Sequence, residues 1–370
     1  MWAGSRERIR EMVRKEYLQL FRDPRLWRIM FIAPLIQLIV FGYAVSTDVH
    51  DTSTFVVDHS NSRASRELVD AFTASGYFRV VGGSRRPADL VRMLDAGDAR
   101  VGIEIPADFS ARLHDGAGAV VQIVFDGTDS NTATVAQGYA ERIVQNYAAR
   151  LSGDVRLAIE LRERAWFNPN LVSRDYNVPA VAGAIVFLMC LLLTALAVVR
   201  EREIGTLEQL MVSPLAAYEL IAGKTIPFAL IGLADVFLVT GAAVLWFEVP
   251  FMGSFSLLLL ASLLYILSSL GIGLLISITS RTQQDAFLTT FLIFMPAILL
   301  SGFMFPVSSM PEIFQWLTLV NPMRHYLEIV RSIFLKGSDI SALWQQFLAL
   351  LVLGVVMLGI AASRFRKTVA

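Results

Sequence analysis

Few residues of this chain have the types and spacing that covalent chemistry requires. Lys224 follows Gly223, but no glycine stands five residues before Gly223 and no strand leads into the pair, so the phosphate-binding loop of ATPases is missing. The sequence also contains no HExxH, no Gly-x-Ser-x-Gly and no pair of cysteines. We therefore expect no catalysis by this chain alone and no bound cofactor.

The pattern of potential ligands also argues against a metal site. The Asp-Gly-Thr-Asp turn at 126–129 lacks the later Asp, Gly and Glu positions of a calcium loop. The histidines His50, His59 and His114 lack metal-ligand spacing. Cys190 lies in an apolar run and is best interpreted as a small packing residue. We predict that no metal is bound.

Asp235 lies in the middle of a long apolar run. A carboxylate at that depth in a membrane is expensive, so we expect it to face a cavity or a protein partner and not lipid. Two interpretations stay open. Asp235 is either a site that senses substrate or protons, or a protonated or hydrogen-bonded packing residue.

These residues are carried by a chain that is too apolar for an ordinary soluble protein. Of its 370 residues 55% are apolar, the mean hydropathy is +0.56 and the formal net charge is zero. We therefore expect a membrane protein. No global basic field argues for a nucleic-acid partner.

Six apolar runs have the length of a membrane span. They cover 29–47, 178–199, 226–247, 257–279, 286–305 and 341–362. Eight Lys and Arg residues precede the first apolar run, the last of them Arg28. The positive-inside tendency places them in the cytoplasm. An even number of spans returns the basic tail 363–370 to the same side. The chain is thus predicted to be an α-helical membrane protein with six transmembrane helices and both termini in the cytoplasm.

Residues 1–28 are predicted to form an amphipathic helix in the cytoplasmic membrane interface. Ile9, Met12 and Leu20 fall on its apolar face and Lys15 on its polar face. A soluble helix packed on a partner protein has the same pattern. A signal peptide is the competing interpretation of the first apolar run, and the long charged leader disfavours it.

The segment 48–177 is polar and alternates between strand-like and helix-like stretches. Short runs of β-type residues lie at 55–57, 78–81, 101–105 and 120–125. Such alternation predicts a small α/β domain with a covered sheet. Because the segment lies between the first and second spans, we expect it to be extracytoplasmic.

The predicted outer stretch 306–340 contains basic residues that the charge rule would place inside. Arg324, Glu328 and Arg331 fall at i, i+4 and i+7 on one helical face, opposite an apolar stripe. We therefore predict two amphipathic or re-entrant helices, at 311–319 and 322–335, that dip back against other protein. The residues assigned to this re-entrant segment are Asn321, Pro322, Arg324, Glu328 and Arg331.

The loop 200–225 joins the second and third predicted spans. Its first four residues are charged, so they must lie at or beyond the membrane surface. Ser213-Pro214 has the features of a helix start, and Gly223 is predicted to close that helix. The pattern predicts two short helices on the cytoplasmic surface, and an ordinary solvated loop fits the periodicity equally well.

Resemblance to a known family gives this loop a function. The string RERExGTLEQLxVSP, followed by GK and a Pro-containing span, resembles the cytoplasmic loop of ABC-2-type exporter permeases. The phrase VGIEIPADFSARL and the strings around 306–340 resemble the same family. In that family the loop is the coupling helix, which docks on the ATPase subunit. The resemblance assigns ATPase coupling to Glu201, Arg202, Glu203, Gly205, Thr206, Leu207, Glu208, Gln209, Leu210, Ser213, Pro214, Gly223 and Lys224.

The resemblance implies an assembly in the bacterial cytoplasmic (inner) membrane. Two permeases, identical or related, would bind two ATPase subunits that use ATP and Mg. ATPase closure would tilt the second and third spans and open a path between the permeases. The apolar second and fifth spans would line that path, which favours an apolar or amphipathic cargo such as a drug or lipid-like molecule. The residues assigned to the path are Phe187, Met189, Asp235, Phe291, Phe294 and Met295.

Two other functions stay open. A membrane sensor or assembly scaffold could bind a ligand with its outer domain, but six spans without a cytoplasmic domain count against it. A permease for lipids or glycans is disfavoured because such permeases generally lack a large outer domain. The sequence does not disclose whether the outer domain meets a periplasmic adaptor and an outer-membrane channel.

Overall fold

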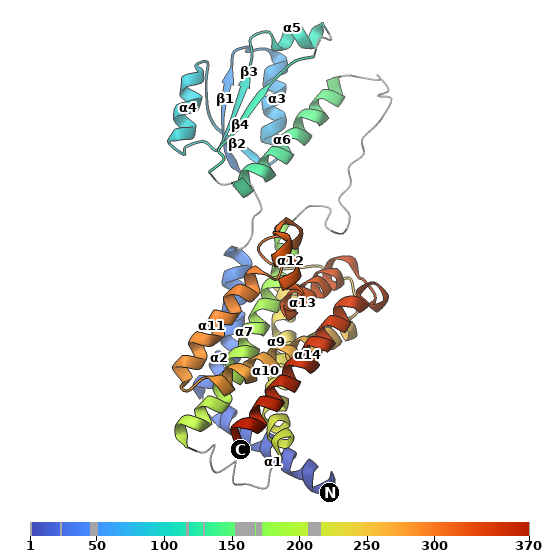
Figure 1. Cartoon of the computed structure of the whole chain (residues 1–370). Coiled ribbons are helices and arrows are strands. Elements are labelled where there is room, and N and C mark those ends of the chain that lie inside the picture. Colours follow the sequence, from blue (N-terminus) through green and yellow to red (C-terminus); the bar gives the residue numbers. More distant parts are fainter. Residues whose placement is uncertain are drawn as a thin grey trace. The chain divides into compact units, whose positions relative to one another are not determined.

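The computed structural model divides the chain into two units (Figure 1). It describes residues 2–22, 24–44, 51–115, 118–128, 130–151, 167, 172–205 and 216–369. One unit, here called the helical unit, comprises Met1–Ser46 and Ala165–Ala370. The other, here called the α/β unit, comprises Thr47–Arg164.

The described part of the α/β unit is a four-stranded sheet in the order β2-β1-β3-β4 with helices beside it. Its strands are β1 (Thr52–Asp58), β2 (Phe78–Ser84), β3 (Val101–Ile105) and β4 (Gln122–Phe125). Strand β1 pairs in parallel with β2 and β3, whereas β3 and β4 are antiparallel. The helices are α3 (Arg63–Ala74), α4 (Pro87–Asp95), α5 (Phe109–His114) and α6 (Ser130–Leu151). The four strands lie at or around the positions that the β-type runs indicated.

Helices cover both faces of this sheet because side chains alternate along its central strand. Phe55 and Val57 of β1 pack with Leu90 of α4 on one face. Val56 points the other way, into a core that includes Leu68 of α3. The unit therefore has a covered sheet between helical layers (Figure 1).

The helical unit is built around α7, which packs against α2, α9, α10, α11 and α13. The bounds of its α-helices are α1 (Trp2–Arg22), α2 (Pro24–Ala44), α7 (Ser173–Ile204), α9 (Ala217–Leu245), α10 (Phe255–Thr279), α11 (Gln283–Leu299), α12 (Glu312–Thr318), α13 (Pro322–Arg331) and α14 (Ile340–Val369). A 3₁₀ turn at Val307–Ser309 precedes α12, and a π-helical turn at Ser332–Lys336 follows α13.

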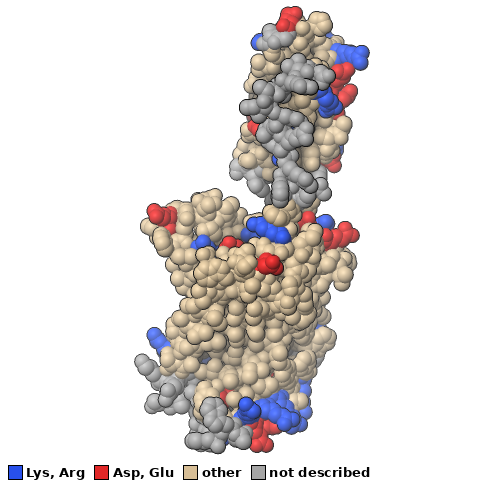
Figure 2. Space-filling model, turned by 90° about the vertical axis from the view of Figure 1, so that its right-hand side faces the viewer, with Lys and Arg blue, Asp and Glu red and all other residues tan. Residues whose placement is uncertain are grey.

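Four helices of the described chain are long and apolar enough to cross a membrane, by length and composition. They are Ser173–Ile204, Tyr218–Leu245, Phe255–Thr279 and Ile340–Arg364. The predicted first and fifth spans correspond to shorter apolar helices, Met30–Ala44 and Gln283–Leu299. Figure 2 shows charged side chains gathered at the two ends of the helical unit, with a broad uncharged band between them.

Within the predicted loop 200–225 the structure describes the end of one helix and the start of the next. Helix α7 continues through residues 200–204 and ends at Gly205, whose φ of +81° suits glycine. Helix α9 starts at Ala217 and runs without a break through Gly223 and Lys224, so the prediction that Gly223 closes a separate short helix is wrong. The glycine serves helix packing instead, because a Cβ there would lie 2.5 Å from Cγ of Met12 in α1.

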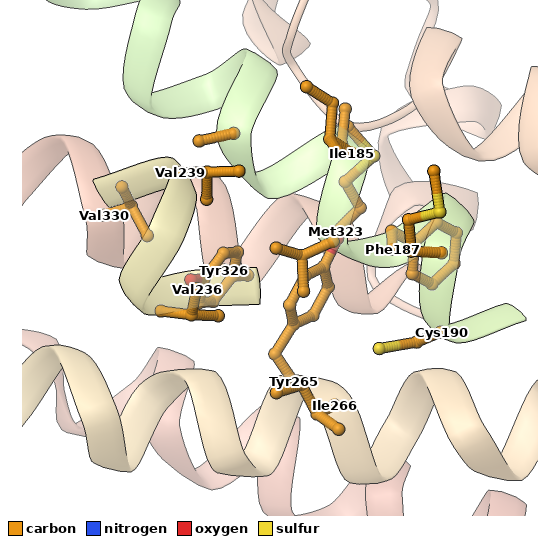
Figure 3. Close-up of a cluster of buried hydrophobic side chains, with 14 of the residues drawn as sticks. Ile185, Phe187, Cys190, Val236, Val239, Tyr265, Ile266, Met323, Tyr326 and Val330 are labelled. Atoms are coloured by element: carbon orange, nitrogen blue, oxygen red, sulfur yellow. The ribbon is translucent and has the colours of Figure 1, made fainter. Parts of the chain in front are cut away.

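Helix α13 packs its apolar face against α7 and α10. The Tyr326 ring stacks on Tyr265 with centroids 4.0 Å apart, and its hydroxyl hydrogen-bonds with the Ser262 hydroxyl at 2.9 Å (Figure 3). The Tyr265 hydroxyl donates to the Gly183 carbonyl of α7 at 3.1 Å. A Cβ at Gly183 would lie 2.9 Å from Leu327, so the glycine allows α13 to approach. The short helix is thereby fixed to the centre of the bundle.

Candidate functional site at the ends of the 206–215 loop

The candidate site is a set of charged side chains where α1 crosses the ends of α7 and α9. Helix α1 turns Ser5, Met12, Glu16 and Leu20 inward, and these positions recur at roughly helical spacing. Two of these four buried residues are polar. Helix α1 therefore brings both apolar contacts and a carboxylate to the start of α9.

Lys224 is at the centre of the site. Its side chain is 1% exposed, and its ammonium lies 2.7 Å from the Glu201 carboxylate of α7 and 3.4 Å from the Glu16 carboxylate of α1. Lys15 also pairs with Glu201, at 2.5 Å, and its ammonium lies 3.8 Å from Glu16. These four residues, called here the ion-pair cluster, join three helices with balanced charge.

A second ion pair holds the start of α9. Arg8 of α1 donates two hydrogen bonds to the Glu219 carboxylate, at 3.0 and 2.6 Å. Such a bidentate pair is directional as well as electrostatic. Glu219 also accepts the backbone N–H of Ala216 at 3.0 Å, which caps the helix. The hydrogen bond to Glu219 raises the pKa of Arg8 above its usual range.

The end of α7 is tied to the turn between α10 and α11. Arg202 donates to the Ser280 carbonyl at 2.7 Å. The Glu203 carboxylate accepts the backbone N–H of Gln283 at 2.8 Å and also the side-chain amide of Gln283. Charged residues at the end of a long apolar helix are thus used to join it to its neighbours.

The two helix ends that flank residues 206–215 are therefore both anchored to other helices. Residues before position 206 contact α1, α9 and the α10–α11 turn. Residues after position 215 contact α1. These contacts are ion pairs and hydrogen bonds that hold α1, α7 and α9 together.

The structure locates part of the predicted coupling set. Glu201 and Lys224 are buried in the ion-pair cluster, Arg202 and Glu203 bind the α10–α11 turn, and Gly205 ends α7. Gly223 contacts α1. The coupling residues outside the described residues are Thr206, Leu207, Glu208, Gln209, Leu210, Ser213 and Pro214.

Sequence reasoning missed four members of this site, Arg8, Lys15, Glu16 and Glu219, although it placed Lys15 on the polar face of the first helix. A signal for Glu16 was available, because it lies four residues from both Met12 and Leu20 and so interrupts an apolar face with a charge. Glu219 lies three residues after Ala216, the position from which a Glu side chain caps a helix start. Arg8 had no comparable signal.

A cavity of about 600 Å³ adjoins the ion-pair cluster. Glu16 and Glu201 lie on its wall with apolar side chains that include Leu193 and Phe228. It lies among residues of α1, α2, α7, α9 and α11. In the described chain, no group of three or more His, Cys, Asp or Glu residues could hold a metal ion.

The six residues predicted to line a path do not share one surface. Phe187, Met189 and Asp235 are buried in the bundle, and neither carboxylate oxygen of Asp235 has a hydrogen-bond partner among the described residues. Phe291 and Met295 lie on an exposed face of α11. Phe294 joins the two groups, because its ring lies 6.4 Å from those of both Phe187 and Phe291.

The predicted re-entrant residues lie at α13. The Asn321 side chain caps the helix by accepting the Met323 N–H at 3.1 Å, and Pro322 occupies its first turn. Arg324 and Arg331 are half-buried, whereas Glu328 is exposed. The charged face that the sequence predicted is therefore partly enclosed by protein.

Comparison with known proteins places the whole chain in one family. A family model described as "ABC-2 family transporter protein" matches residues 24–363. The chain is 35% identical over 364 residues to "Probable multidrug ABC transporter permease YbhR" of Escherichia coli (strain K12), covering 98% of this chain and 99% of that protein.

Two further permeases from the same strain are also similar to this chain over most of its length. "Probable multidrug ABC transporter permease YbhS" is 32% identical over 369 residues, covering 98% of each chain. "Inner membrane transport permease YhhJ" is 29% identical over 360 residues, covering 90% of this chain and 93% of that protein. Because the match extends over nearly the full length, this chain belongs to the ABC-2 family of transporters.

Proposed function

We propose that this protein is the permease subunit of an ATP-driven exporter and that its 206–215 loop docks on a separate ATPase subunit. The observation that carries the proposal is the anchoring of both ends of that loop. Glu201 and Lys224 join them to each other and to α1, with the ammonium of Lys224 2.7 Å from Glu201. A loop that only linked two spans would need no such frame.

In this proposal the residues near the loop have different roles. Leu207 and Leu210 enter an apolar groove of the ATPase, where buried apolar anchors supply most of the binding energy. Glu201 and Lys224 hold the frame and do not contact the ATPase, because both side chains are enclosed by the permease itself. Glu208 sets the orientation of the complex.

The frame converts ATPase closure into movement of helices. Because α7 and α9 are both continuous with the loop, a shift of the loop changes their relative tilt. Helix α1 moves with them, because Arg8 binds Glu219 and because Lys15 and Glu16 belong to the ion-pair cluster.

The cargo is proposed to be an apolar or amphipathic compound. Two of the relatives carry the words "probable multidrug" in their names, and the helices at the centre of this chain are strongly apolar. The exposed apolar face of α11 is proposed to meet a second permease, since a large exposed apolar surface needs either lipid or a partner.

The proposed topology has six spans in the bacterial inner membrane. Helices α2 and α11 complete the set, and the charged ends of the helical unit lie at the two membrane surfaces. Both termini and the 206–215 loop are cytoplasmic, and the α/β unit is extracytoplasmic.

Co-purification tests the docking role. Leu207→Asp should abolish recovery of the ATPase and export while leaving membrane insertion intact, because a carboxylate in an apolar pocket is unpaired. Val91→Asp is the matched control, because Val91 is 56% exposed on α4 of the other unit. Normal ATPase recovery and export by the Leu207 variant would show that the docking proposal is wrong.

A further inference from the structure

A second cavity is lined by the first turn of α7, residues in the 301–307 stretch, α13 and the π-helical turn that follows it. Figure 1 shows α12 and α13 toward the end of the helical unit opposite α1. The volume of the cavity is about 450 Å³. Apolar side chains of Val307, Leu327 and Leu335 form part of its wall. The rest of the wall carries an unusual concentration of positive charge.

One of the cations in this wall is Arg331, which is half-buried. Its guanidinium lies 3.7 Å from the centroid of the Tyr176 ring and donates to the carbonyls of Gly302, at 3.0 Å, and Tyr176, at 3.4 Å. Its Nη2 atom is shielded from solvent and has no acceptor within the described chain. These two carbonyl groups and the Tyr176 ring are neutral, so they do not compensate the charge of Arg331.

Two further cations line the same cavity. Arg324 donates to the Gln315 carbonyl at 3.2 Å and to the Thr318 hydroxyl, and Lys336 lies 5.8 Å from the centroid of the Phe167 ring. Among the described lining residues Glu328 is the carboxylate, and it makes no ion pair within the described chain. Three cations against one carboxylate leave a formal net charge of +2.

The geometry points to a binding site for the phosphate group of an anionic phospholipid. Two guanidinium groups and the ammonium of the exposed Lys336 line one cavity, and such groups bind phosphate oxygens, which accept several hydrogen bonds at once. The apolar part of the wall suits the glycerol and acyl portion of the same molecule. An amphipathic ligand with one phosphate therefore fits both halves of the cavity.

This inference adds a lipid ligand to the protein and does not depend on ATPase docking. In the proposed topology the site lies at the outer surface, where the positive-inside tendency disfavours three cations. A bound anionic headgroup would explain why they are there. It would also stabilise the packing of α13, which carries Arg324, on the centre of the bundle.

Native mass spectrometry of the delipidated full-length protein tests the site. Phosphatidylglycerol and phosphatidylcholine with the same acyl chains are titrated in parallel, and the wild type is expected to prefer phosphatidylglycerol. The double variant Arg324→Gln, Lys336→Gln should weaken phosphatidylglycerol binding on the order of tenfold or more, because each lost bond is charge-assisted. Phosphatidylcholine has the same phosphate but also a cationic choline group, which the net positive charge of the cavity disfavours, so its weaker binding should change less.

The controls separate the site from general effects. Arg79→Gln removes one positive charge, as Arg331→Gln does, from an exposed position on β2 of the other unit, and should leave the binding of both lipids unaffected. Arg331→Gln should weaken phosphatidylglycerol binding as the double variant does. If Arg331→Gln does not fold, the double variant alone tests the site. Inorganic phosphate is added as a competitor. If it displaces the lipid, the site recognises the phosphate group alone, and if it does not, the site recognises the whole lipid.

Two results would overturn the inference. One is equal affinity of the wild type for phosphatidylglycerol and phosphatidylcholine. The other is unchanged phosphatidylglycerol binding after loss of Arg324 and Lys336 in a variant that melts like the wild type.

Discussion

Replacing Lys224 by methionine should destabilise the helical unit more than any loss of an exposed charge. Lys224 is enclosed with two carboxylates, Glu16 and Glu201, whose side chains are 6% and 8% exposed. Methionine keeps most of the volume but removes the charge. Within the ion-pair cluster the variant therefore leaves two buried carboxylates and the cation of Lys15.

The size of the stability loss depends on the cation that remains beside the two carboxylates. Removing one member of a buried ion pair typically costs about 3–5 kcal/mol. Lys15 still lies 2.5 Å from Glu201 and 3.8 Å from Glu16, so we expect a loss near the lower limit, about 3 kcal/mol. For a unit of this size that corresponds to a fall of about 6–12 °C in melting temperature.

Melting of the purified protein in detergent measures this loss. Lys15→Met is the matched control, and because its side chain is 34% exposed it should lose about 1 kcal/mol or less. In the double variant Lys224→Met, Glu201→Gln the charge is balanced again, so part of the stability should return. The single variant Glu201→Gln completes the comparison. If the loss in the double variant equals the sum of the Lys224→Met and Glu201→Gln losses to within about 0.5 kcal/mol, the two side chains are not coupled and the ion-pair cluster does not act as described.

Two further changes test the packing and the buried carboxylate. Gly223→Val should lower the melting temperature and reduce export, because a Cβ at this position would lie 2.5 Å from Cγ of Met12 and the valine would displace that side chain. Adding Met12→Ala should restore part of the stability and part of the export. A Gly223→Val variant as stable as the wild type would contradict the contact. Asp235→Val should raise stability by about 1–3 kcal/mol, because it removes a buried carboxylate that has no hydrogen-bond partner in the described chain, and a lower melting temperature would refute this. Export that survives Asp235→Val favours a packing role, whereas export lost from a stabilised protein favours a functional one.

Many of the strands and helices could be predicted from the local pattern of apolar and polar residues. The β-type runs at 101–105 and 120–125 lie at or around β3 and β4, because side chains of a covered sheet are apolar on both faces. The helical spacing of Arg324, Glu328 and Arg331 likewise agrees with α13. In each case the signal lies within one short stretch of sequence.

The limits of α7 and α9 could not be derived in this way. The charges after the apolar run placed residues 200–203 at or beyond the membrane surface but did not predict that α7 continues to Ile204, where its charges find partners on neighbouring helices. Gly223 was interpreted as a helix end, since glycine is a poor helix former. Its contact with Met12 lies 211 residues away along the chain, and no local pattern reports such a contact.

The candidate site was predictable only in part for the same reason. The resemblance singled out Glu201 and Lys224, but it gave them to the ATPase interface, whereas the structure encloses them with Lys15 and Glu16. Their partners come from the opposite end of the sequence. Only the fold brings these charges together.

The affinity of the isolated ATPase for the full-length permease in lipid nanodiscs tests the central claim most directly. The wild type is compared with the Leu207→Asp, Leu210→Asp double variant and with Val91→Asp. Each anchor should contribute about 2 kcal/mol or more, so loss of both should weaken binding about several hundredfold, and Val91→Asp should bind like the wild type. Equal affinity of all three proteins would contradict docking of the ATPase on the 206–215 loop.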